Sequence, residues 1–383
     1  MDKYQNIPSP CYVVEEELLI KNLELIKSVA VAADVEIIMA FKAFAMWKIF
    51  PIISKYIDKT TASSLSEAQL AVEKFRCKAH SYAPVYTNKE FPDIVACSSH
   101  ITFNSQAQFE KFYPQTQKYN ISCGLRINPE ISIVETDIYN PAAKGSRLGI
   151  TADLLPEKLP QGIEGLHFHV LCESSSFDLE KVLLAVEQKF DRQLMQVKWL
   201  NMGGGHLITK QGYNVNHLIE VLKAFKQKYP HLHIILEPGA AFVWNTGILI
   251  SEVQDIVENH GIKTAMLDVS FACNMPDCLE MPYQPEIRGA KIINNQSKIN
   301  DTQYCYRMGG NSCLSGDYVG SWEFEKELKV GDRIIFEDMI HYTTVKTTMF
   351  NGVSHPSIGL LRTNGMFTLL REFTYQDYLK RMC

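Results

Sequence analysis

The feature that most constrains the fold is an alternation of short, β-branched apolar runs with stretches of helical spacing. Eight such runs occur before residue 240, and each ends in polar or small residues. Between them lie helical patterns such as "NHLIEVLKAFKQKY", in which Leu218, Leu222 and Phe225 share one face. Eight consecutive strand–helix units are typical of a (β/α)8 barrel. The predicted strands are 35–42, 60–64, 79–84, 100–104, 121–128, 162–170, 197–205 and 232–239.

Beyond Gly239 the pattern changes to strand-like stretches with few helical segments between them. These stretches read "TGILISEVQDIVE", "KTAMLDVSF", "RIIFEDM" and "YTTVKTTMF". We therefore expect an α/β chain with a TIM-type (β/α)8 barrel over 13–242 and a mostly β domain over 243–383. The N-terminal segment 1–12 precedes the first helix, and we expect its strand to join the sheet of the second domain.

Composition excludes several classes of partner. With 46% hydrophobic and 21% charged residues the chain is globular, and 38 basic against 43 acidic residues argue against binding to nucleic acid or a membrane surface. No apolar run approaches the roughly 20 residues of a membrane span, and the start lacks the pattern of a signal peptide. Ten cysteines without a CxxC pair are typical of reduced thiols in the cytoplasm, rather than of disulfides or a metal site.

Catalytic residues of such barrels lie at the C-terminal ends of the strands. Lys42 ends the first predicted strand, and lysine is rarely left in a core without a partner. Desolvation there lowers the pKa of an amine, and such an amine forms a Schiff base with a carbonyl compound, most often pyridoxal phosphate. The alternative is that Lys42 extends into solvent from the strand end. The lysine alone does not decide between a cofactor-binding and a solvent-exposed residue.

Three more strand ends carry groups that suit the same cofactor. "NMGGGH" places Gly203, Gly204 and Gly205 after the seventh strand, where barrels often hold a phosphate, although a tight turn explains three glycines equally well. Glu237 in "LEPG" is positioned to hold the proton of a pyridine nitrogen; otherwise it is a surface carboxylate before a turn. His169 is placed to lie against the ring, whereas a lone strand histidine is more often a satisfied core residue.

Together these residues resemble the fold-type III pyridoxal-phosphate decarboxylases, the group of alanine racemase, ornithine decarboxylase and diaminopimelate decarboxylase. Within that group the chain is similar to the carboxynorspermidine/carboxyspermidine decarboxylases. The similarity extends over nearly the whole chain. It is carried by "PCYVVEEELLIKNL", "AFKAFA", "FNSQAQF", "YNPAAKGSRLGI", "EGLHFHVLCESS", "KWLNMGGGHLITKQGY", "MPDCLEMPY", "GGNSCLSGD", "IHYTTVKTTMFNG" and "REFTYQDY".

The resemblance implies a role for each matching residue. Lys42 carries the cofactor, His169 stacks on its ring, the glycine loop binds the phosphate and Glu237 pairs with the pyridine nitrogen. Further cofactor contacts are implied for Tyr342, toward the phosphate, and for Arg147, near the glutamate. Such enzymes are usually homodimers with shared active sites, so Cys313 and Asp317 of "CLSGD" act in the partner's site. A thiol is a competent acid for returning a proton to the substrate carbon, although most cysteines are inert and buried.

Departures from the family pattern bear on the substrate. Leu314 stands where diaminopimelate and ornithine decarboxylases carry an acidic residue, which makes their substrates a poor fit. Ala240 and Asn274 replace residues of many carboxynorspermidine decarboxylases, which leaves the substrate contacts at these positions open. We assign Asp277 and Asp317 to the cationic end of a polyamine, with a solvated loop aspartate as the alternative for Asp277.

The expected reaction is therefore the decarboxylation of carboxynorspermidine or carboxyspermidine to norspermidine or spermidine, in polyamine biosynthesis. A diaminopimelate- or ornithine-type decarboxylase and an amino-acid racemase on the same fold are the alternatives.

Overall fold

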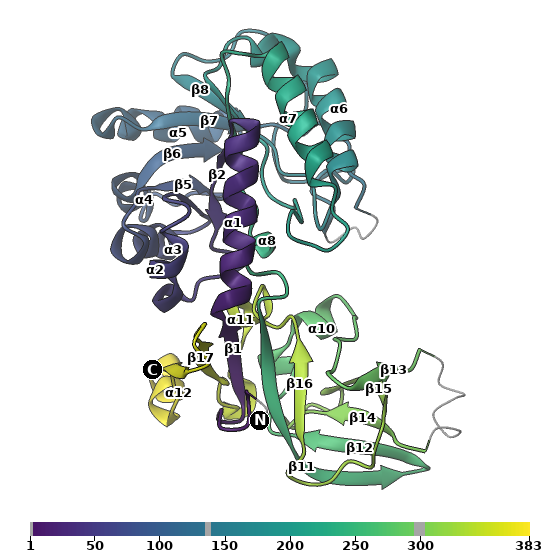
Figure 1. The fold of residues 1–383 in the computed structure, drawn as a ribbon. Coiled ribbons are helices and arrows are strands. Elements are labelled where there is room, and N and C mark those ends of the chain that lie inside the picture. The colour runs from purple at the N-terminus through teal and green to yellow at the C-terminus, as the bar shows by residue number, and fades with distance from the viewer. Residues whose placement is uncertain (1–2, 135–138, 295–302) are drawn as a thin grey trace. The chain divides into compact units, whose positions relative to one another are not determined.

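The computed structural model describes residues 3–134, 139–294 and 303–383. Its chain contacts divide it into two compact units (Figure 1). One unit is Ile20–Phe242, and the other combines Met1–Leu19 with Val243–Cys383.

The first unit is built around a parallel sheet that closes on itself, in the order β2-β10-β9-β8-β7-β6-β5-β4-β3. All eight runs predicted as strands form strands here, which confirms the (β/α)8 barrel. The strand predicted over 35–42 is interrupted at Ile38, because its first half pairs with β10 and its second half with β4. The strands are β2 (Glu36–Ile37), β3 (Met39–Ala40), β4 (Thr60–Ala62), β5 (Ala79–Tyr82), β6 (Ser98–Phe103), β7 (Ser122–Arg126), β8 (Ile163–His167), β9 (Trp199–Asn201) and β10 (His233–Leu236).

Helices follow most of these strands and begin at residues that cap them. Ser64 accepts a hydrogen bond from the Glu67 amide at the start of α3, and Ser105 does the same for Gln108 in α5. Between β7 and β8 the described residues contain no α-helix. The helical segments are α1 (Glu16–Ala33), η1 (Trp47–Ile49), α2 (Phe50–Ile53), α3 (Leu65–Leu70), η2 (Ala71–Phe75), α4 (Phe91–Cys97), α5 (Gln106–Thr116), η3 (Gln117–Tyr119), α6 (Ser176–Leu194), α7 (Val215–Lys228) and α8 (Ala240–Val243).

The two longest helices after β8 show why the sequence pattern predicted them. In α7, Leu218, Leu222 and Phe225 are buried, as their spacing predicted. In α6, Ser175 and Asp178 form a capping box, in which each side chain accepts a hydrogen bond from the other residue's backbone amide. Figure 1 shows α6 and α7 side by side on the outside of the strands. The buried faces of α6 and α7 therefore cover part of the outside of the barrel.

The second unit contains a mixed sheet in the order β13-β15-β14-β12-β11-β1-β17-β18, with β16 paired to β11. The N-terminal strand β1 (Cys11–Glu15) is buried between β11 and β17: Cys11 lies opposite Ile250 in an antiparallel pair and opposite Ser357 in a parallel one. The other strands are β11 (Gly247–Asn259), β12 (Ile262–Leu267), β13 (Ala290–Ile292), β14 (Cys305–Gly309), β15 (Tyr318–Phe324), β16 (Arg333–Glu337), β17 (Ser357–Leu361) and β18 (Phe367–Arg371).

One strand predicted for this unit is wrong. The run "YTTVKTTMF" forms a short helix and a 3-10 turn, because one threonine hydroxyl bonds a backbone carbonyl one turn earlier and another bonds Asp277 on a separate segment of the same unit. Thr344 Oγ1 donates to the Ile340 carbonyl at 3.0 Å, and Thr343 Oγ1 donates to Asp277 at 2.8 Å. The helical segments of this unit are α9 (Phe271–Asn274), α10 (Asp277–Glu280), α11 (Thr343–Lys346), η6 (Phe350–Gly352) and α12 (Tyr375–Met382).

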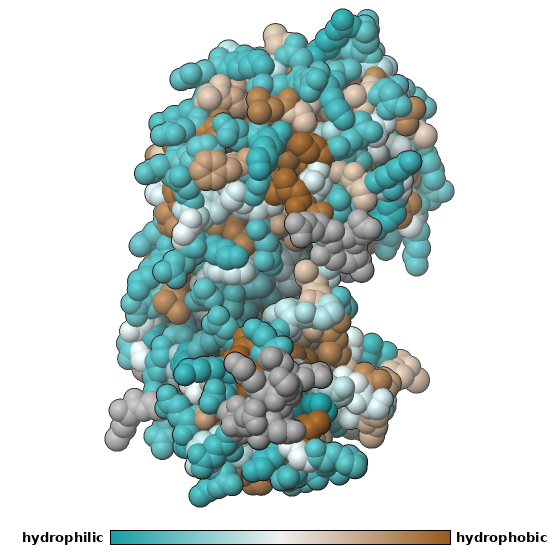
Figure 2. Space-filling model, turned by 90° about the vertical axis from the view of Figure 1, so that its right-hand side faces the viewer, coloured by the Kyte–Doolittle hydropathy of each residue, from teal (hydrophilic) through white to brown (hydrophobic). Residues whose placement is uncertain are grey.

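Figure 2 shows one face on which hydrophilic residues predominate and hydrophobic residues lie among them in small groups. Among the described residues, none of the helices has both the length and the apolar character needed to cross a membrane.

Candidate functional site

Lys42 lies two residues beyond β3, at the C-terminal end of the barrel strands. Its side chain is partly buried, and Nζ lies 3.2 Å from His169 Nε2. Burial lowers the pKa of the Lys42 amine, and this effect outweighs the opposing attraction of the Glu237 charge. An amine with a lowered pKa is a better nucleophile near neutral pH. The structure therefore gives Lys42 the environment that the sequence predicted.

His169 lies two residues beyond β8, and both of its ring nitrogens are engaged. The Gly204 amide donates to Nδ1 at 2.8 Å, and Nε2 faces Lys42. Burial holds the pKa of His169 well below its ordinary value, and the charges of Lys42 and Arg126 lower it further. The Arg126 guanidinium also donates to the His169 carbonyl at 2.9 Å. The ring is therefore neutral and fixed in orientation.

Glu237 follows β10 directly, with its side chain only 13% exposed. Asn201 Nδ2 donates to Oε1 at 2.6 Å, and His167 Nε2 lies 3.6 Å from Oε2. Burial alone raises the pKa of a carboxyl group, but the contacts with His167 and Asn201 outweigh burial and lower the pKa of Glu237. The residue is therefore an ionised carboxylate inside the barrel mouth.

The glycine loop after β9 packs tightly against its neighbours. Gly203 and Gly205 have φ values of 68° and 93°, which side chains rarely adopt. A Cβ on Gly204 would lie 2.4 Å from the Glu237 carbonyl oxygen. The Gly203 amide donates to Asn201 Oδ1 at 2.9 Å, so the Gly203 and Gly204 amides both have partners within the protein. Phosphate binding by this loop stays a prediction.

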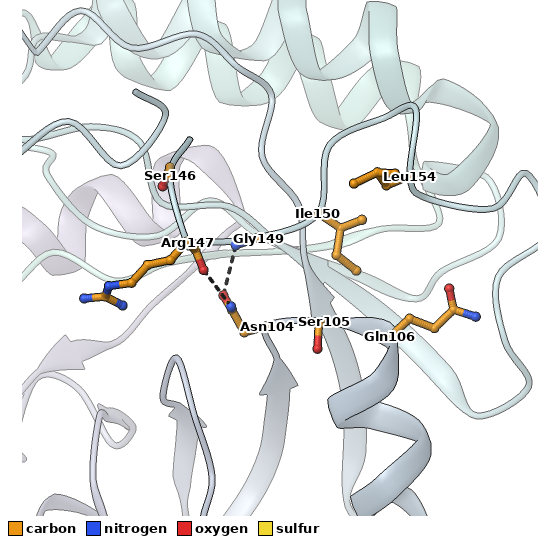
Figure 3. A pocket seen from close by; sticks show the side chains of 8 residues that line it. All are labelled: Asn104, Ser105, Gln106, Ser146, Arg147, Gly149, Ile150 and Leu154. Atoms are coloured by element: carbon orange, nitrogen blue, oxygen red, sulfur yellow. Dashed lines mark hydrogen bonds between the residues drawn. The ribbon is translucent and has the colours of Figure 1, made fainter. Parts of the chain in front are cut away.

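Arg147 is exposed and lines a hollow of about 340 Å³ beside the ends of β6 and β7. Figure 3 shows Asn104 held against the loop, with its amide donating to the Arg147 carbonyl at 2.8 Å and its Oδ1 accepting from the Gly149 amide. The Arg147 side chain points away from Ile150 and Leu154 in this view. Its predicted role near Glu237 stays a prediction.

In the second unit, Cys313 is exposed on the loop between β14 and β15. Its amide donates to Asn351 Oδ1 at 2.9 Å. Asp317 on the same loop is 5% exposed, and both of its carboxylate oxygens have partners. Oδ1 accepts from the Ala272 amide at 2.9 Å, and Oδ2 accepts from the amide and hydroxyl of Ser312. Asp317 therefore holds the Cys313 loop in place.

Asp277 differs from Asp317 in one respect that matters for binding. It is 7% exposed, and its Oδ2 accepts from the hydroxyls of Tyr283 at 2.9 Å and Thr343 at 2.8 Å. Its Oδ1 is buried without a hydrogen-bond partner among the described residues. An unpaired buried carboxylate oxygen is costly, which makes this atom a candidate contact for a cationic ligand.

The remaining predicted residues are placed as follows. Asn274 is fully buried and bonds within its own unit, with Oδ1 accepting from the Ser270 amide at 2.9 Å. Tyr342 is partly buried at the start of α11 and has a left-handed φ of 42°. Ala240 begins α8 and is 8% exposed. Their roles toward a ligand stay predictions.

Sequence reasoning missed two residues of the barrel mouth, His167 and Asn201. The signal was present, since His167 and His169 are two positions apart in "LHFHV" and residues two apart on a strand point to the same face. Asn201 is the last residue of β9. It could not be assigned without knowing that β9 pairs with β10, which brings it to Glu237.

Comparison with known proteins agrees with this geometry. Residues 11–340 match the family model described as the C-terminal sheet domain of the pyridoxal-dependent decarboxylases. A carboxyaminopropylagmatine decarboxylase from Synechocystis is 49% identical, covering 99% of this chain and 97% of that protein. A carboxynorspermidine/carboxyspermidine decarboxylase from Campylobacter jejuni is 42% identical, covering 99% of each.

A solved structure shows the same fold. The crystal structure of carboxynorspermidine decarboxylase from Campylobacter jejuni, complexed with norspermidine, has a TM-score of 0.91 and 42% identity. The match covers 98% of this chain and 100% of that one. This chain belongs to the pyridoxal-dependent decarboxylases.

Proposed function

We propose that this enzyme decarboxylates carboxynorspermidine or carboxyspermidine, giving norspermidine or spermidine in polyamine biosynthesis. The observation that carries the proposal is the end-to-end similarity, at 42% identity, to a relative named for these two substrates. The buried, unpaired Oδ1 of Asp277 supports it, because a polyamine substrate brings a cation to pair with such an oxygen.

The residues of the barrel mouth fit pyridoxal phosphate by the chemistry of their donors. Lys42 offers an amine for the aldehyde, Glu237 offers an ionised carboxylate for the ring nitrogen, and His169 offers an imidazole held between Lys42 and the Gly204 amide. When bound at these residues, pyridoxal phosphate would supply a sink for the electrons released when the substrate carboxylate leaves as CO2. We propose these roles for the three residues, with the loop Gly203–Gly205 packed around the phosphate, with Tyr342 contacting the phosphate and with Arg147 near the glutamate.

The protein's own contribution is to orient the substrate and to move a proton. We propose that Cys313 returns the proton to the substrate carbon, since the residue is exposed and its backbone amide is held by Asn351. Asp277 meets the cationic end of the substrate. Asp317, predicted for the same role, has both carboxylate oxygens bonded within the protein, and we propose that it keeps the Cys313 loop in place. Leu314, 44% exposed and apolar, suits methylene groups better than an ammonium.

A second substrate is favoured by a separate observation, the 49% identity to the relative named for carboxyaminopropylagmatine. That molecule ends in a guanidinium rather than an ammonium. A guanidinium binds a carboxylate best through two parallel hydrogen bonds. Asp277 has one oxygen already occupied by two hydroxyls, so the single remaining oxygen fits an ammonium better.

The test compares kcat/KM on one preparation for six substrates: carboxynorspermidine, carboxyspermidine, carboxyaminopropylagmatine, diaminopimelate, ornithine and lysine. We expect the two carboxypolyamines to lead. We expect Asp277→Asn to reduce their kcat/KM by roughly 30-fold or more, because removing one charge of a buried pair costs about 2 kcal/mol or more. The Asp255→Asn variant, at an exposed aspartate of β11, is the matched control. A higher value for carboxyaminopropylagmatine selects the second candidate, and a higher value for diaminopimelate or ornithine rejects both.

We also propose that the two units act as the barrel and β domains. The predicted bounds are 13–242 and 243–383, and the barrel domain begins after β1, because that strand belongs to the sheet of the second unit. We further propose that the enzyme is a cytoplasmic homodimer with shared sites. All ten cysteines are free thiols, which supports a reducing compartment. The exposure of Cys313 and Leu314 on their own unit supports contact with another molecule at that loop.

A further inference from the structure

The ring of His169 lies between the backbone amide of Gly204 and the side-chain amine of Lys42. The Gly204 N–H points at Nδ1 from 2.8 Å, and Nε2 lies 3.2 Å from Lys42 Nζ. A backbone amide can only donate, so Nδ1 must be the acceptor of the first hydrogen bond.

That assignment determines the second hydrogen bond. A neutral imidazole carries one proton, and with Nδ1 unprotonated the proton is on Nε2. Nε2 is then a donor, so a hydrogen bond with Lys42 requires a lone pair on Nζ. A protonated Lys42 has three N–H donors and no lone pair, so it cannot accept a hydrogen bond from the Nε2 proton. Only an unprotonated Lys42 completes the pair.

We propose that the Gly204 amide fixes His169 in the tautomer protonated on Nε2, and that this N–H holds Lys42 as the free amine. His169 is thus a positioning residue that keeps Lys42 ready to react with the aldehyde of the cofactor. The inference rests on the proposed function only in taking Lys42 as the attachment site; the hydrogen-bond pattern is independent of it.

The charged groups around Lys42 also affect whether its amine is protonated. Glu237, Cys172 and Glu67 favour the cation, whereas Arg126 disfavours it. Burial is the largest effect and lowers the pKa of Lys42, so the net direction agrees with a free amine. Around His169, burial and the charges of Lys42, Arg126, His167 and His206 all disfavour the doubly protonated ring.

The tautomer is measured directly by nitrogen NMR. The full-length protein is labelled with 15N in its histidine rings, freed of pyridoxal phosphate, and compared with His169→Phe to identify the His169 signals. We expect a protonated Nε2 and an unprotonated Nδ1 at pH 7. A protonated Nδ1 overturns the proposal.

The effect on Lys42 is measured by competitive acetylation of the same cofactor-free protein over a range of pH, with exposed Lys89 as the internal reference. Three variants separate the contacts. His169→Phe removes both hydrogen bonds, His169→Asn keeps an acceptor near Gly204 only, and His169→Gln keeps a donor near Lys42 only. Circular dichroism checks that each one is folded.

We expect the midpoint of Lys42 acetylation to rise by about one pH unit in the Phe and Asn variants, because one lost hydrogen bond changes the equilibrium about tenfold. The Gln variant should stay near the parent. Equal midpoints in all four proteins, or equal shifts in all three variants, overturn the proposal. The assignment of Lys42 as the attachment site is tested separately, by mapping the borohydride-reduced cofactor adduct. A failure of that assignment therefore leaves the proposed His169 tautomer untouched, and the reverse also holds.

Discussion

At the scale of single residues, the chemistry depends on an amine and a carboxylate that the barrel keeps partly out of water. Lys42 has its pKa lowered by burial, while Glu237 keeps its charge because Asn201 and His167 contact it. Burial disfavours the charged form of both residues. It prevails at Lys42, whereas at Glu237 the contacts with Asn201 and His167 outweigh it and keep the carboxylate charged.

Replacing Lys42 by alanine should remove covalent cofactor attachment and leave the fold intact, since the side chain lies at the barrel mouth and is not part of the apolar core. We expect turnover to fall at least roughly 10³-fold, as for other groups that act in the chemical step. Mass spectrometry after borohydride reduction should place the adduct on Lys42 in the parent and find none in the variant. An adduct on another lysine rejects the assignment, and Lys89→Ala is the exposed control.

At the scale of elements, the glycine loop after β9 connects three residues of the barrel mouth. It contacts Asn201 and His169 through its amides, and it packs on the Glu237 backbone. A change in the backbone of this loop should therefore shift both Glu237 and His169.

The substitution Gly204→Ala should destabilise the protein by about 1–3 kcal/mol, because the added methyl group would lie 2.4 Å from a backbone oxygen that cannot move aside easily. Gly316→Ala is the matched control, since a Cβ there meets nothing within 4 Å. Urea unfolding compares the two, and we expect the control to change stability by less than about 0.5 kcal/mol. Similar losses in both variants would contradict the packing argument.

At the scale of the whole molecule, the barrel interior contains several histidines that burial keeps neutral. Burial lowers the pKa of His80 to about 3, with the charge of His100 adding to it, and lowers the pKa of His100 and of His206 to about 4. His80 and His100 stack with ring centroids 3.9 Å apart. Unfolded histidines take up a proton near pH 6.5, so below that pH the unfolded state binds more protons than the folded one.

The free energy of unfolding should therefore fall as the pH drops from 6.5, by about 1.4 kcal/mol per pH unit for each such histidine, until the folded-state pKa is reached. His80→Phe removes one titrating group and should reduce this slope by about one histidine's share. His260→Asn, at an exposed turn with a φ of 51° that asparagine tolerates, should leave it unchanged. Urea titrations at several pH values measure the slope, and an unaltered slope in His80→Phe would contradict the account.

The proposed homodimer makes a prediction of its own. If Cys313 acts in the partner's site, mixing inactive Lys42→Ala and Cys313→Ala subunits should restore part of the activity, up to about a quarter for random exchange with one intact site per mixed dimer. Exchange is followed by native mass spectrometry. No recovery despite exchange would place the cysteine in its own subunit's site or outside catalysis.

The amino-acid sequence by itself determined the fold class and the principal residues of the barrel mouth. The eight apolar runs predicted the strands, and because catalytic groups of a barrel lie at strand ends, Lys42, His169, the glycine loop and Glu237 could be named from their positions. The family resemblance supplied the cofactor and pointed to the second unit.

Only the tertiary structure decided how these residues are paired. The interruption at Ile38, the helix at "YTTVK" and the contacts of Glu237 with His167 and Asn201 depend on which segments meet in space. The same is true of the Gly204 amide on His169 and of the difference between Asp317, whose oxygens are both bonded, and Asp277, whose Oδ1 is not. A hydrogen bond depends on distance and direction between groups far apart in the chain, and no local pattern encodes these.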